Sequence, residues 1–440
     1  MSDRPLETSL RAEDEVVEIC QNLIRYDTSN YGDGSGPGER AAAEYTAELL
    51  EEVGLEAELF ESAPGRASVV ARIEGADPSA TALVVHGHLD VVPAQKEDWS
   101  VDPFAAELRD GLIWGRGAVD MKDMDAMVLS VVRELQRTGA RPKRDLVIAM
   151  FADEEAGGTY GARWAVDNRP ELFDGAKEAI SEVGGFSAEI GGQRTYMLQT
   201  AEKGLSWLKL TASGRAGHGS QTNPDNAVTR LARAVSRIGA HEWPIELTDT
   251  TRRFLDGVTE LTGVEFDQEN PEILLKELGT FARFVGATLQ NTSNPTVLKA
   301  GYKDNVIPGS AEARIDVRTL PGQDELVLEK IKELAGDGID FAFVHHDVSL
   351  ETPFEGALVE SMVGALEAED PGARVLPYTL SGGTDNKSLS RLGITGYGFA
   401  PLQLPADLDF AGMFHGVDER VPAESLRFGA RVLRRLLTTY

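Results

Sequence analysis

The sequence has little cysteine, a shortage of basic charge and no long apolar runs. Cys20 is the only cysteine among 440 residues, so no disulfide forms within the chain, which favours a reducing compartment, the cytoplasm. The 43 Lys and Arg against 72 Asp and Glu leave a formal net charge of −29, which argues against nucleic-acid binding and against anionic membranes. Residues 1–17 are acidic where a signal peptide is basic, and no apolar run approaches the roughly 18 residues of a membrane span. A soluble cytoplasmic protein is expected.

Short β-branched segments alternate with amphipathic segments in the first part of the chain. The length and a hydrophobic fraction of 42% suit two or three domains with buried cores. Alternating strands and helices predict an α/β fold, with a mixed, mainly parallel sheet flanked by helices. The expected strands cover residues 67–73, 81–89 and 145–151, and the expected helices cover residues 13–26, a segment ending at Glu52, and 121–137.

A second pattern begins near residue 202. Its order, strand-helix-strand-strand-helix-strand, is that of a ferredoxin-like α+β unit. Helix and strand alternate again from Thr352, so the unit is expected to be inserted into the first domain. The predicted division is a catalytic domain in two parts, 1–201 and 352–440, and a lid domain at 202–351 that carries a further insertion at about 241–294.

Residues able to bind metal fall just past the ends of expected strands, where open α/β sheets build their sites. His88 and Asp90 lie on one side of an extended chain, so His88 fits a metal ligand whose ring Asp90 orients. A turn in which backbone groups satisfy the imidazole explains this motif equally well. Asp120 begins a helix after a glycine-rich turn, and the helix dipole alone explains Asp123 and Asp125.

Asp153, Glu154 and Glu155 end a strongly apolar strand, and a divalent cation offsets the repulsion among crowded carboxylates. Glu182 and His415 each follow a strand or loop, and with the other clusters they make a set of nitrogen and oxygen donors without thiolate. Such a set suits two zinc ions, with Mn²⁺ or Co²⁺ as substitutes. Paired ions polarise a carbonyl and deprotonate a water molecule, so the expected reaction is hydrolysis.

The order of these motifs resembles the di-zinc peptidase and amidohydrolase family of aminoacylase, acetylornithine deacetylase, succinyl-diaminopimelate desuccinylase, glutamate carboxypeptidase and the carnosine dipeptidases. The matching elements span nearly the whole chain: HGHLDVVPA, WSVDPF, GLIWGRGAVDMKD, ADEEAGG, ISEVGG, GRAGHGS, DNVIPGSAEARIDVRTLPG, SGGTD and FHGVDE. The resemblance implies that His88 and Glu182 bind one zinc, that Glu155 and His415 bind the other, and that Asp120 bridges both. It makes Asp90 the partner of His88, and Glu154 the general base for the metal-bridging water.

The resemblance also implies how substrate is held. His218 stabilises the oxyanion in the active site of the other subunit, which requires a homodimer joined through the lid domains. Asn305 and Arg318 hold the substrate, with Arg318 gripping its carboxylate and Arg314 as a substitute on the same strand face. The loop with Gly382, Gly383 and Thr384 lies against that carboxylate. His345, His346 and His241 have no counterpart in the family and are interpreted as structural.

Two substrate classes stay open for an amide hydrolase of this kind. WSVDPF and the long insertion favour a dipeptidase or carboxypeptidase, and an N-acyl-amino-acid deacylase is the alternative. A metal-binding scaffold without catalysis is a remote alternative, because the chain keeps Glu154 as a base. A serine hydrolase needs a G-x-S-x-G elbow, which the sequence lacks.

Overall fold

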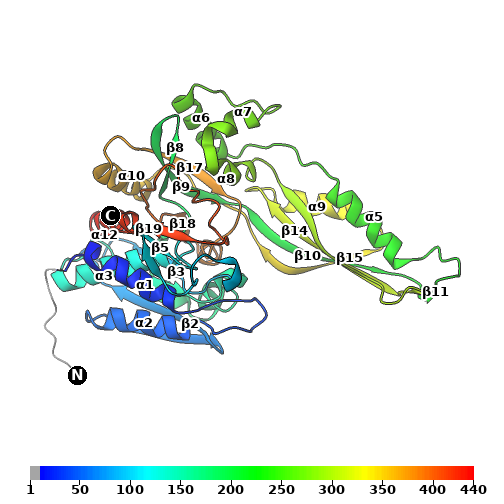
Figure 1. Ribbon diagram of the computed structural model, residues 1–440, viewed down its shortest axis with the longest axis horizontal. Coiled ribbons are helices and arrows are strands. Elements are labelled where there is room, and N and C mark those ends of the chain that lie inside the picture. The colour runs from blue at the N-terminus through cyan, green and yellow to red at the C-terminus, as the bar shows by residue number, and fades with distance from the viewer. Residues whose placement is uncertain (1–9) are drawn as a thin grey trace.

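Two β-sheets organise the part of the chain that the computed structural model describes, residues 10–440. Residues 1–9 lie outside the described residues. They belong to the acidic segment 1–17, which is not expected to be a signal peptide. The larger sheet has ten strands in the order β1-β2-β6-β3-β7-β18-β9-β16, with β8 and β17 also paired to β9 (Figure 1). Its strands are β1 (Ala57–Ala63), β2 (Arg66–Ile73), β3 (Ala82–His88), β6 (Leu146–Phe151), β7 (Ala176–Ser181), β8 (Phe186–Ile190), β9 (Gln193–Glu202), β16 (Leu350–Glu351), β17 (Arg374–Leu380) and β18 (Thr395–Gly398).

The centre of the large sheet is parallel, and its edges are antiparallel. Strand β3 runs parallel to both β6 and β7, and β18 runs parallel to β7. At one edge β1 and β2 pair antiparallel, and at the other β8 and β16 pair antiparallel with β9. The expected mixed sheet flanked by helices is confirmed.

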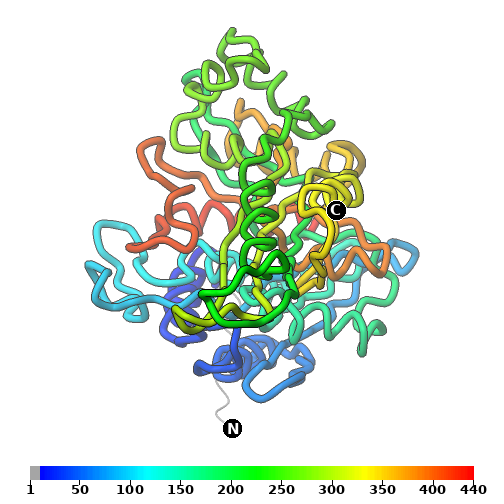
Figure 2. Tube along the Cα trace, turned by 90° about the vertical axis from the view of Figure 1, so that its right-hand side faces the viewer, coloured from blue at the N-terminus to red at the C-terminus, as the bar shows by residue number. Residues whose placement is uncertain are grey.

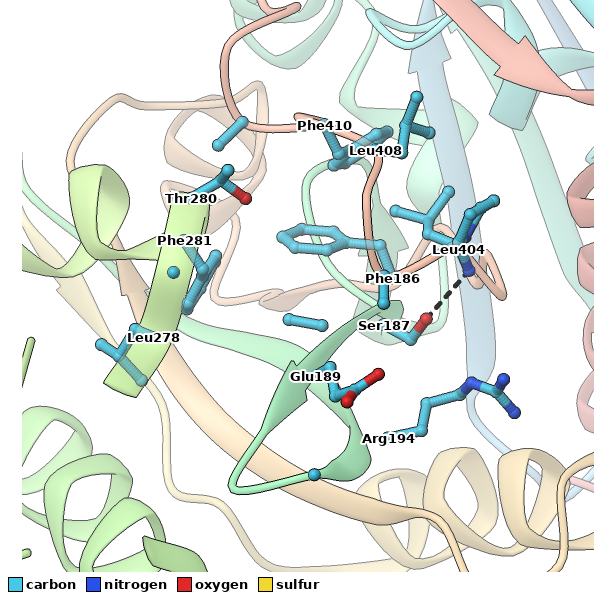
Figure 3. A pocket seen from close by; sticks show the side chains of 16 residues that line it. Phe186, Ser187, Glu189, Arg194, Leu278, Thr280, Phe281, Leu404, Leu408 and Phe410 are labelled. Carbon is cyan, nitrogen blue, oxygen red and sulfur yellow. Dashed lines mark hydrogen bonds between the residues drawn. The ribbon is translucent and has the colours of Figure 1, made fainter. Parts of the chain in front are cut away.

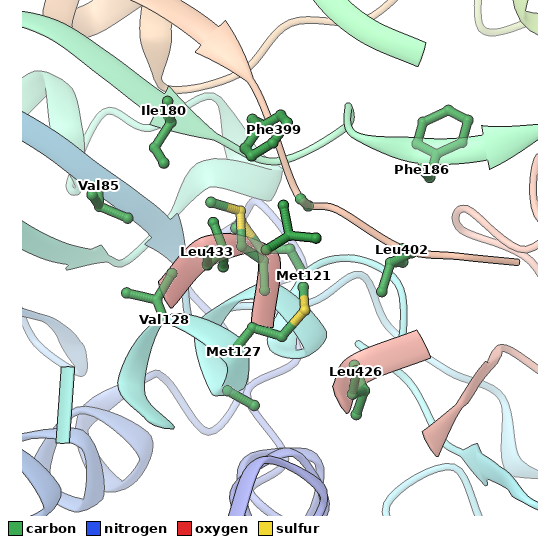
Figure 4. Close-up of a cluster of buried hydrophobic side chains, with 14 of the residues drawn as sticks. Val85, Met121, Met127, Val128, Ile180, Phe186, Phe399, Leu402, Leu426 and Leu433 are labelled. Atoms are coloured by element: carbon green, nitrogen blue, oxygen red, sulfur yellow. The ribbon is translucent and has the colours of Figure 1, made fainter. Parts of the chain in front are cut away.

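Side chains alternate between the two faces of the sheet along each strand, and helices bury both faces. On β3, Leu83 and Val85 join the core built with α1, α3 and α12, whereas Val84 joins a second core with α4 and α11. Figure 4 shows Val85 among Val128 and Leu433, which come from α3 and α12. The flanking helices are α1 (Ala12–Arg25), α2 (Arg40–Glu51), α3 (Lys122–Thr138), α4 (Ala162–Asn168), α10 (Ala357–Glu369), α11 (Asn386–Ser390) and α12 (Ala423–Thr439).

The smaller sheet has the strand order β12-β14-β10-β15, which is that of a ferredoxin-like unit. Alternate residues of β10, such as Leu208 and Leu210, pack against Leu231 of α5 and Val327 of α9 in a core of their own. Figure 2, viewed from this end of the molecule, shows α5 running down the middle of the picture. The elements are β10 (Gly204–Ser213), α5 (Ala227–Gly239), β12 (Thr292–Ala300), β14 (Ser310–Thr319), α9 (Asp324–Ala335), β15 (Ile339–Asp347), and at the tip β11 (Gly217–His218) and β13 (Val306–Ile307).

Most of the segment at about 241–294, expected as part of the lid, packs on the large sheet, whereas Trp243 belongs to the core of the small sheet. Phe254 and Val258 of α6 (Asp249–Thr262), Phe281, and Val285 of α8 (Ala282–Gly286) belong to the same core as the large sheet. The short helix α7 (Glu272–Leu275) lies between them in sequence. The position of the segment between strands of the small unit predicts that it belongs to the lid. The apolar side chains of its helices instead pack on β8, β9 and β17.

A third, three-stranded sheet joins two distant parts of the chain. It has the order β19-β5-β4, where β4 is Glu107–Arg109, β5 is Leu112–Trp114 and β19 is Arg420–Pro422. Pairing of Arg420 with Trp114 brings the loop that carries His415 beside the turn that carries Asp120. Among residues 10–440, no helix has the length and apolar character needed to cross a membrane.

Candidate metal centre

The carboxyl ends of three neighbouring parallel strands, β6, β3 and β7, meet at one edge of the large sheet. Functional side chains of open α/β sheets gather at such an edge, because the chain leaves every strand there. Asp120 and His415 reach it from the turn before α3 and the loop before β19. The residues that end or follow the three strands themselves are His88, Glu154, Glu155 and Glu182.

Asp120 presents one carboxylate oxygen to each of two histidines. Its Oδ1 lies 3.3 Å from Nε2 of His88, and its Oδ2 lies 3.3 Å from Nε2 of His415. Glu182 Oε2 approaches the same His88 nitrogen to 3.5 Å, and Glu155 Oε2 approaches the His415 nitrogen to 3.1 Å. Two groups of nitrogen and oxygen donors therefore share one carboxylate.

These donors fit divalent cations. Ligand atoms of His88, Asp120 and Glu155 lie within 4.8 Å of one another, as do those of His88, Glu154 and Glu182. Nε2 of His88 and Oε1 of Glu155 are buried and have no hydrogen-bond partner among residues 10–440. A buried unpaired polar atom costs free energy, which a bound cation would recover.

The carboxylates of the cluster also repel one another. Burial raises the pKa of Glu154 well above its usual range, and repulsion from Glu182 adds to that shift. Burial likewise raises the pKa of Glu182 to about 7. At the mouth of the site, hydrogen bonds to Asp120 and Glu155 raise the pKa of His415 to about 10. Crowded acids with raised pKa values mark a place where added positive charge is stabilising.

Asp90 supports the cluster in a way that differs from the expectation. Nδ1 of His88 lies 2.9 Å from the backbone oxygen of Asp90, whereas the Asp90 carboxylate is 3.7 Å away. That carboxylate instead accepts hydrogen bonds from the backbone N–H groups of Glu154 and Glu155, at 3.0 and 3.1 Å, and from the Asn30 amide at 2.9 Å. Asp90 therefore fixes the His88 ring through its backbone and the Glu154 turn through its side chain.

Backbone strain is concentrated beside the same residues. Asp153, Val183 and His415 have φ angles of 68°, 54° and 57°, in the left-handed region that residues other than glycine seldom adopt. For Val183 the conformation is especially unfavourable, because its side chain is β-branched. Strained residues of this kind persist where the surroundings fix them, and they cluster at functional sites.

Glu419 holds the turn that carries Asp120. It ends the FHGVDE motif, but no role was expected for it from the sequence. Its fully buried carboxylate accepts hydrogen bonds from the N–H groups of Gly117, Val119 and Asp120, at 3.1, 2.7 and 3.2 Å. The same carboxylate forms an ion pair with Arg116 at 2.7 Å. Since Glu419 follows His415 by four residues, it ties the two loops of the centre together.

A cavity of about 380 Å³ opens onto the cluster. Arg318, Gly383 and Thr384, expected to bind substrate, all line it, and Arg318 also pairs with Asp316 at 2.8 Å. The N–H and hydroxyl groups of Thr384 both donate to Glu202, at 3.0 and 2.6 Å, so neither is free for a ligand. The structure thus brings the expected carboxylate-binding residues to the centre, but both donor groups of Thr384 are bonded to Glu202 at the end of β9.

His218 and Asn305 lie elsewhere. Both are exposed at the β11–β13 tip of the small sheet, where the Gly219 N–H donates to the Asn305 backbone oxygen at 2.9 Å. Neither residue lines the cavity. Figure 1 shows β11 at the end of the small sheet farthest from β3. Within one chain, these two residues are not part of the centre.

Comparison with known proteins decides the family. The family model described as Peptidase family M20/M25/M40 matches residues 84–439. The chain belongs to this family. It is 29% identical to human aminoacylase-1 over 416 residues, which cover 91% of this chain and 90% of the relative.

Solved structures share the fold of this chain. A metallo-carboxypeptidase from Sulfolobus solfataricus superposes with a TM-score of 0.74 at 18% identity, covering 97% of this chain and 99% of the other. The dipeptidase Dug1p from Saccharomyces cerevisiae gives 0.70 at 16% identity, covering 99% and 98%. The family resemblance inferred from the sequence motifs is confirmed, and as an M20 member the chain is a hydrolase of amide bonds.

Three cavity residues of this M20 chain carry no sequence signal. His345, interpreted as structural, lines the cavity and hydrogen-bonds to the Asp347 carboxylate. Trp207 lies beside it on β10, with ring centroids 5.2 Å apart. Phe284 comes from the segment at 241–294. All three are brought to the centre by packing between elements that are distant in the sequence. The spacing of apolar residues along one strand or helix does not reveal such packing.

Proposed function

We propose that this M20 hydrolase cleaves the amide bond of N-acyl amino acids at a two-metal centre. The observation that carries the proposal is Asp120, whose two oxygens each face a histidine that has a further carboxylate partner. The match to aminoacylase-1 over 91% of the chain supports the N-acyl amino acid as substrate. The proposed ligands are His88, Glu182, Asp120, Glu155 and His415.

The donor set limits the candidate metals. Imidazole and carboxylate ligands without thiolate suit Zn²⁺, and Mn²⁺ or Co²⁺ can replace it. When bound, such ions polarise the amide carbonyl and lower the pKa of a water molecule. Asp90 and Glu419 keep the ligands in place, because each accepts hydrogen bonds from the backbone of a ligand-bearing turn.

Glu154 is the proposed general base. Its carboxylate lines the cavity and lies 4.0 Å from Nε2 of His88, while Asp90 holds its backbone N–H. From that place Glu154 takes a proton from the attacking water and returns it to the departing amine, which is the step a positioned carboxylate can accelerate. Arg318 binds the carboxylate of the amino-acid part, beside the Gly382–Gly383 loop.

A dipeptide is the second candidate substrate. Oδ2 of Asp385 is buried, lacks a hydrogen-bond partner within the described part of the chain, and belongs to a residue that lines the cavity. Burial raises the pKa of Asp385 well above its usual range, and the ammonium group of a dipeptide, which an N-acyl amino acid does not have, would stabilise its charged form.

The proposed enzyme is a cytoplasmic homodimer joined through the small sheet. Strands β12 and β15 are the edges of that sheet, and Leu298, Phe343 and Val344 on them are more than half exposed. Exposed apolar edge strands are ready to pair with another chain. In the dimer, His218 and Asn305 would reach the partner's centre, with His218 stabilising the oxyanion.

A hydrolysis panel tests the proposed function. Enzyme loaded with Zn²⁺, Mn²⁺ or Co²⁺ would be given N-acetyl, N-succinyl and long-chain N-acyl amino acids beside dipeptides. The proposal expects the highest kcat/KM on N-acyl amino acids. Faster hydrolysis of dipeptides, lost in Asp385→Asn, would favour the second candidate, and no hydrolysis of any amide would contradict both.

A further inference from the structure

One wall of the catalytic cavity is aromatic. Phe284, on α8, and Phe414, next to the proposed ligand His415, both line the cavity and are half-buried. Their ring centroids are 5.6 Å apart in an edge-to-face arrangement. The two rings therefore present a joined apolar surface directly beside the metal-ligand cluster, and one of them is supplied by the segment at 241–294.

Buried aromatic rings hold this wall from behind. Phe410 packs on Phe414 at 5.2 Å and on Phe186 at 4.9 Å, and Phe281 packs on Phe284 at 5.5 Å. Phe186, Phe281 and Phe410 also line a second cavity of about 490 Å³ (Figure 3). The two rings of the wall therefore pack on a cluster of other aromatic rings, which fixes their positions.

The charged side of the catalytic cavity comes from other elements. Arg318 lies on β14, and Lys387 follows the Gly382–Gly383 loop. Arg318 pairs with Leu205 of β10 in the strand register, and Trp207 lies two residues farther along the same strand. Leu205 and Trp207 both line the cavity. The side chain and the amide nitrogen of a bound amino acid are both bonded to the carbon that carries the carboxylate, so Arg318 alone does not separate them. The carbonyl to be cleaved must lie at the proposed metal ligands, and Phe414 is next to His415, so the acyl group that continues from this carbonyl faces the aromatic wall.

We propose that Phe284 and Phe414 form the acyl subsite, and that the enzyme selects N-acyl amino acids whose acyl group is large and apolar. This inference rests on the proposed function, since it names the acyl class for the same site. Each methylene buried on such a surface raises the rate by up to about fourfold. Medium-chain and aromatic acyl groups are therefore preferred to acetyl and succinyl.

Acyl chain length is the variable that tests the subsite. Metal-loaded enzyme would be given one amino acid carrying N-acetyl, N-butanoyl, N-hexanoyl, N-octanoyl and N-benzoyl groups. The expected kcat/KM rises along the series, with octanoyl exceeding acetyl by about tenfold or more. A flat or falling series overturns the subsite.

Variants distinguish an effect on acyl selectivity from a general loss of stability in the aromatic cluster. Phe284→Ala should lower the octanoyl-to-acetyl ratio by about fivefold or more, and Phe414→Leu, which keeps an apolar side chain, should lower it less. Leu408→Ala is the matched control, because Leu408 lines the second cavity but not the catalytic one. Its ratio should equal that of the wild type.

A second panel, which varies the amino acid under one acyl group, distinguishes failure of the subsite from failure of the proposed function. Loss of selectivity among amino-acid side chains in Phe284→Ala and Phe414→Leu, with an unchanged acyl ratio, overturns the acyl subsite alone. Hydrolysis of N-acetyl substrates without any acyl preference does the same. Absence of hydrolysis on every amide removes the proposed function and the subsite together.

Discussion

At the scale of residues, the centre is built from groups that are far apart in the chain. Hydrogen bonds to different side chains hold the Asp120 turn and the Glu154 turn. Asp120 faces two histidines, and its turn is held by Glu419, about 300 residues away in sequence. Glu154 is held by its backbone, so its carboxylate remains free for proton transfer. Asp90 holds the backbone of both Glu154 and Glu155, and Glu419 holds the Asp120 turn, but none of these bonds uses the Glu154 carboxylate. The proposed base can therefore be changed without disturbing the proposed ligands.

Replacing Glu154 by Gln should remove catalysis and leave metal binding intact. Loss of a general base costs about 10²- to 10⁴-fold in kcat, whereas the proposed ligands are untouched. Steady-state kinetics and metal analysis of the same preparation provide the measurement. Turnover within a few-fold of the wild type would remove Glu154 as the base.

Replacing Glu419 by Gln should weaken metal binding. The amide cannot accept all the hydrogen bonds that the carboxylate takes from the Asp120 turn, and lost support of a ligand costs about 10- to 100-fold in affinity. Calorimetric titration of metal into metal-free protein measures this. The control is Glu424→Gln, at a side chain that is 82% exposed on α12. Equal affinities in the two variants would contradict the role of Glu419.

Much of the centre could be predicted from sequence, because its ligands follow strand ends in recognisable motifs. Asp123 and Asp125 show the limit of that approach. The helix dipole is sufficient to explain them, yet they are 2% and 0% exposed, and burial raises the pKa of both carboxyl groups well above the usual range. Burial is set by which elements pack together, and local sequence does not carry that information.

At the scale of elements, close packing of helices fixes the scaffold behind the centre. Helices α3 and α12 meet at Gly429, where a Cβ atom would overlap Met127 Sδ and the Pro401 backbone oxygen. The amphipathic period of each helix could be read from the sequence. The need for glycine at their contact could not, because it depends on the crossing of two helices about 300 residues apart.

Gly429→Ala should therefore destabilise the fold. Overpacking a core contact costs about 1 to 3 kcal/mol in the free energy of unfolding. Gly364→Ala in α10 is the matched control. Apart from its own neighbours in the helix, no atom of the described residues lies within 4 Å of the place an added methyl group would take, and alanine there should stabilise by up to about 1 kcal/mol. Urea denaturation measures both variants. Similar midpoints for the two would show that the α3–α12 contact is not tight.

The segment at 241–294 shows why contacts between elements are harder to predict than the elements themselves. Its helices are recognisable in the sequence, and their place between strands of the small unit suggests a lid. Their apolar side chains instead complete the large core and place Phe284 in the catalytic cavity. Sequence order constrains which elements are neighbours along the chain, but burial of apolar surface decides where a long insertion packs.

At the scale of the whole molecule, one chain leaves His218 and Asn305 away from the centre. If the proposed dimer brings His218 to the partner's site, mixing His218→Ala with Glu154→Ala should restore activity. Random pairing makes about half of the dimers mixed, each with one complete site, so about a quarter of wild-type activity is expected. The assay is hydrolysis by the remixed proteins.

Two controls make this mixing experiment decisive. Heterodimers isolated with two different affinity tags establish that exchange has occurred. Glu154→Ala mixed with Asp120→Ala should stay inactive, because both substitutions damage the centre of their own chain. Inactive heterodimers of the first pair would contradict the action of His218 across the interface.

Metal dependence is the most direct test of the central claim. Wild-type protein should bind about two divalent ions per chain, lose hydrolysis of N-acyl amino acids when the metal is removed by a chelator, and regain it with Zn²⁺, Mn²⁺ or Co²⁺. The measurement is activity titrated against metal content on one preparation. Full activity in metal-free protein would contradict the account.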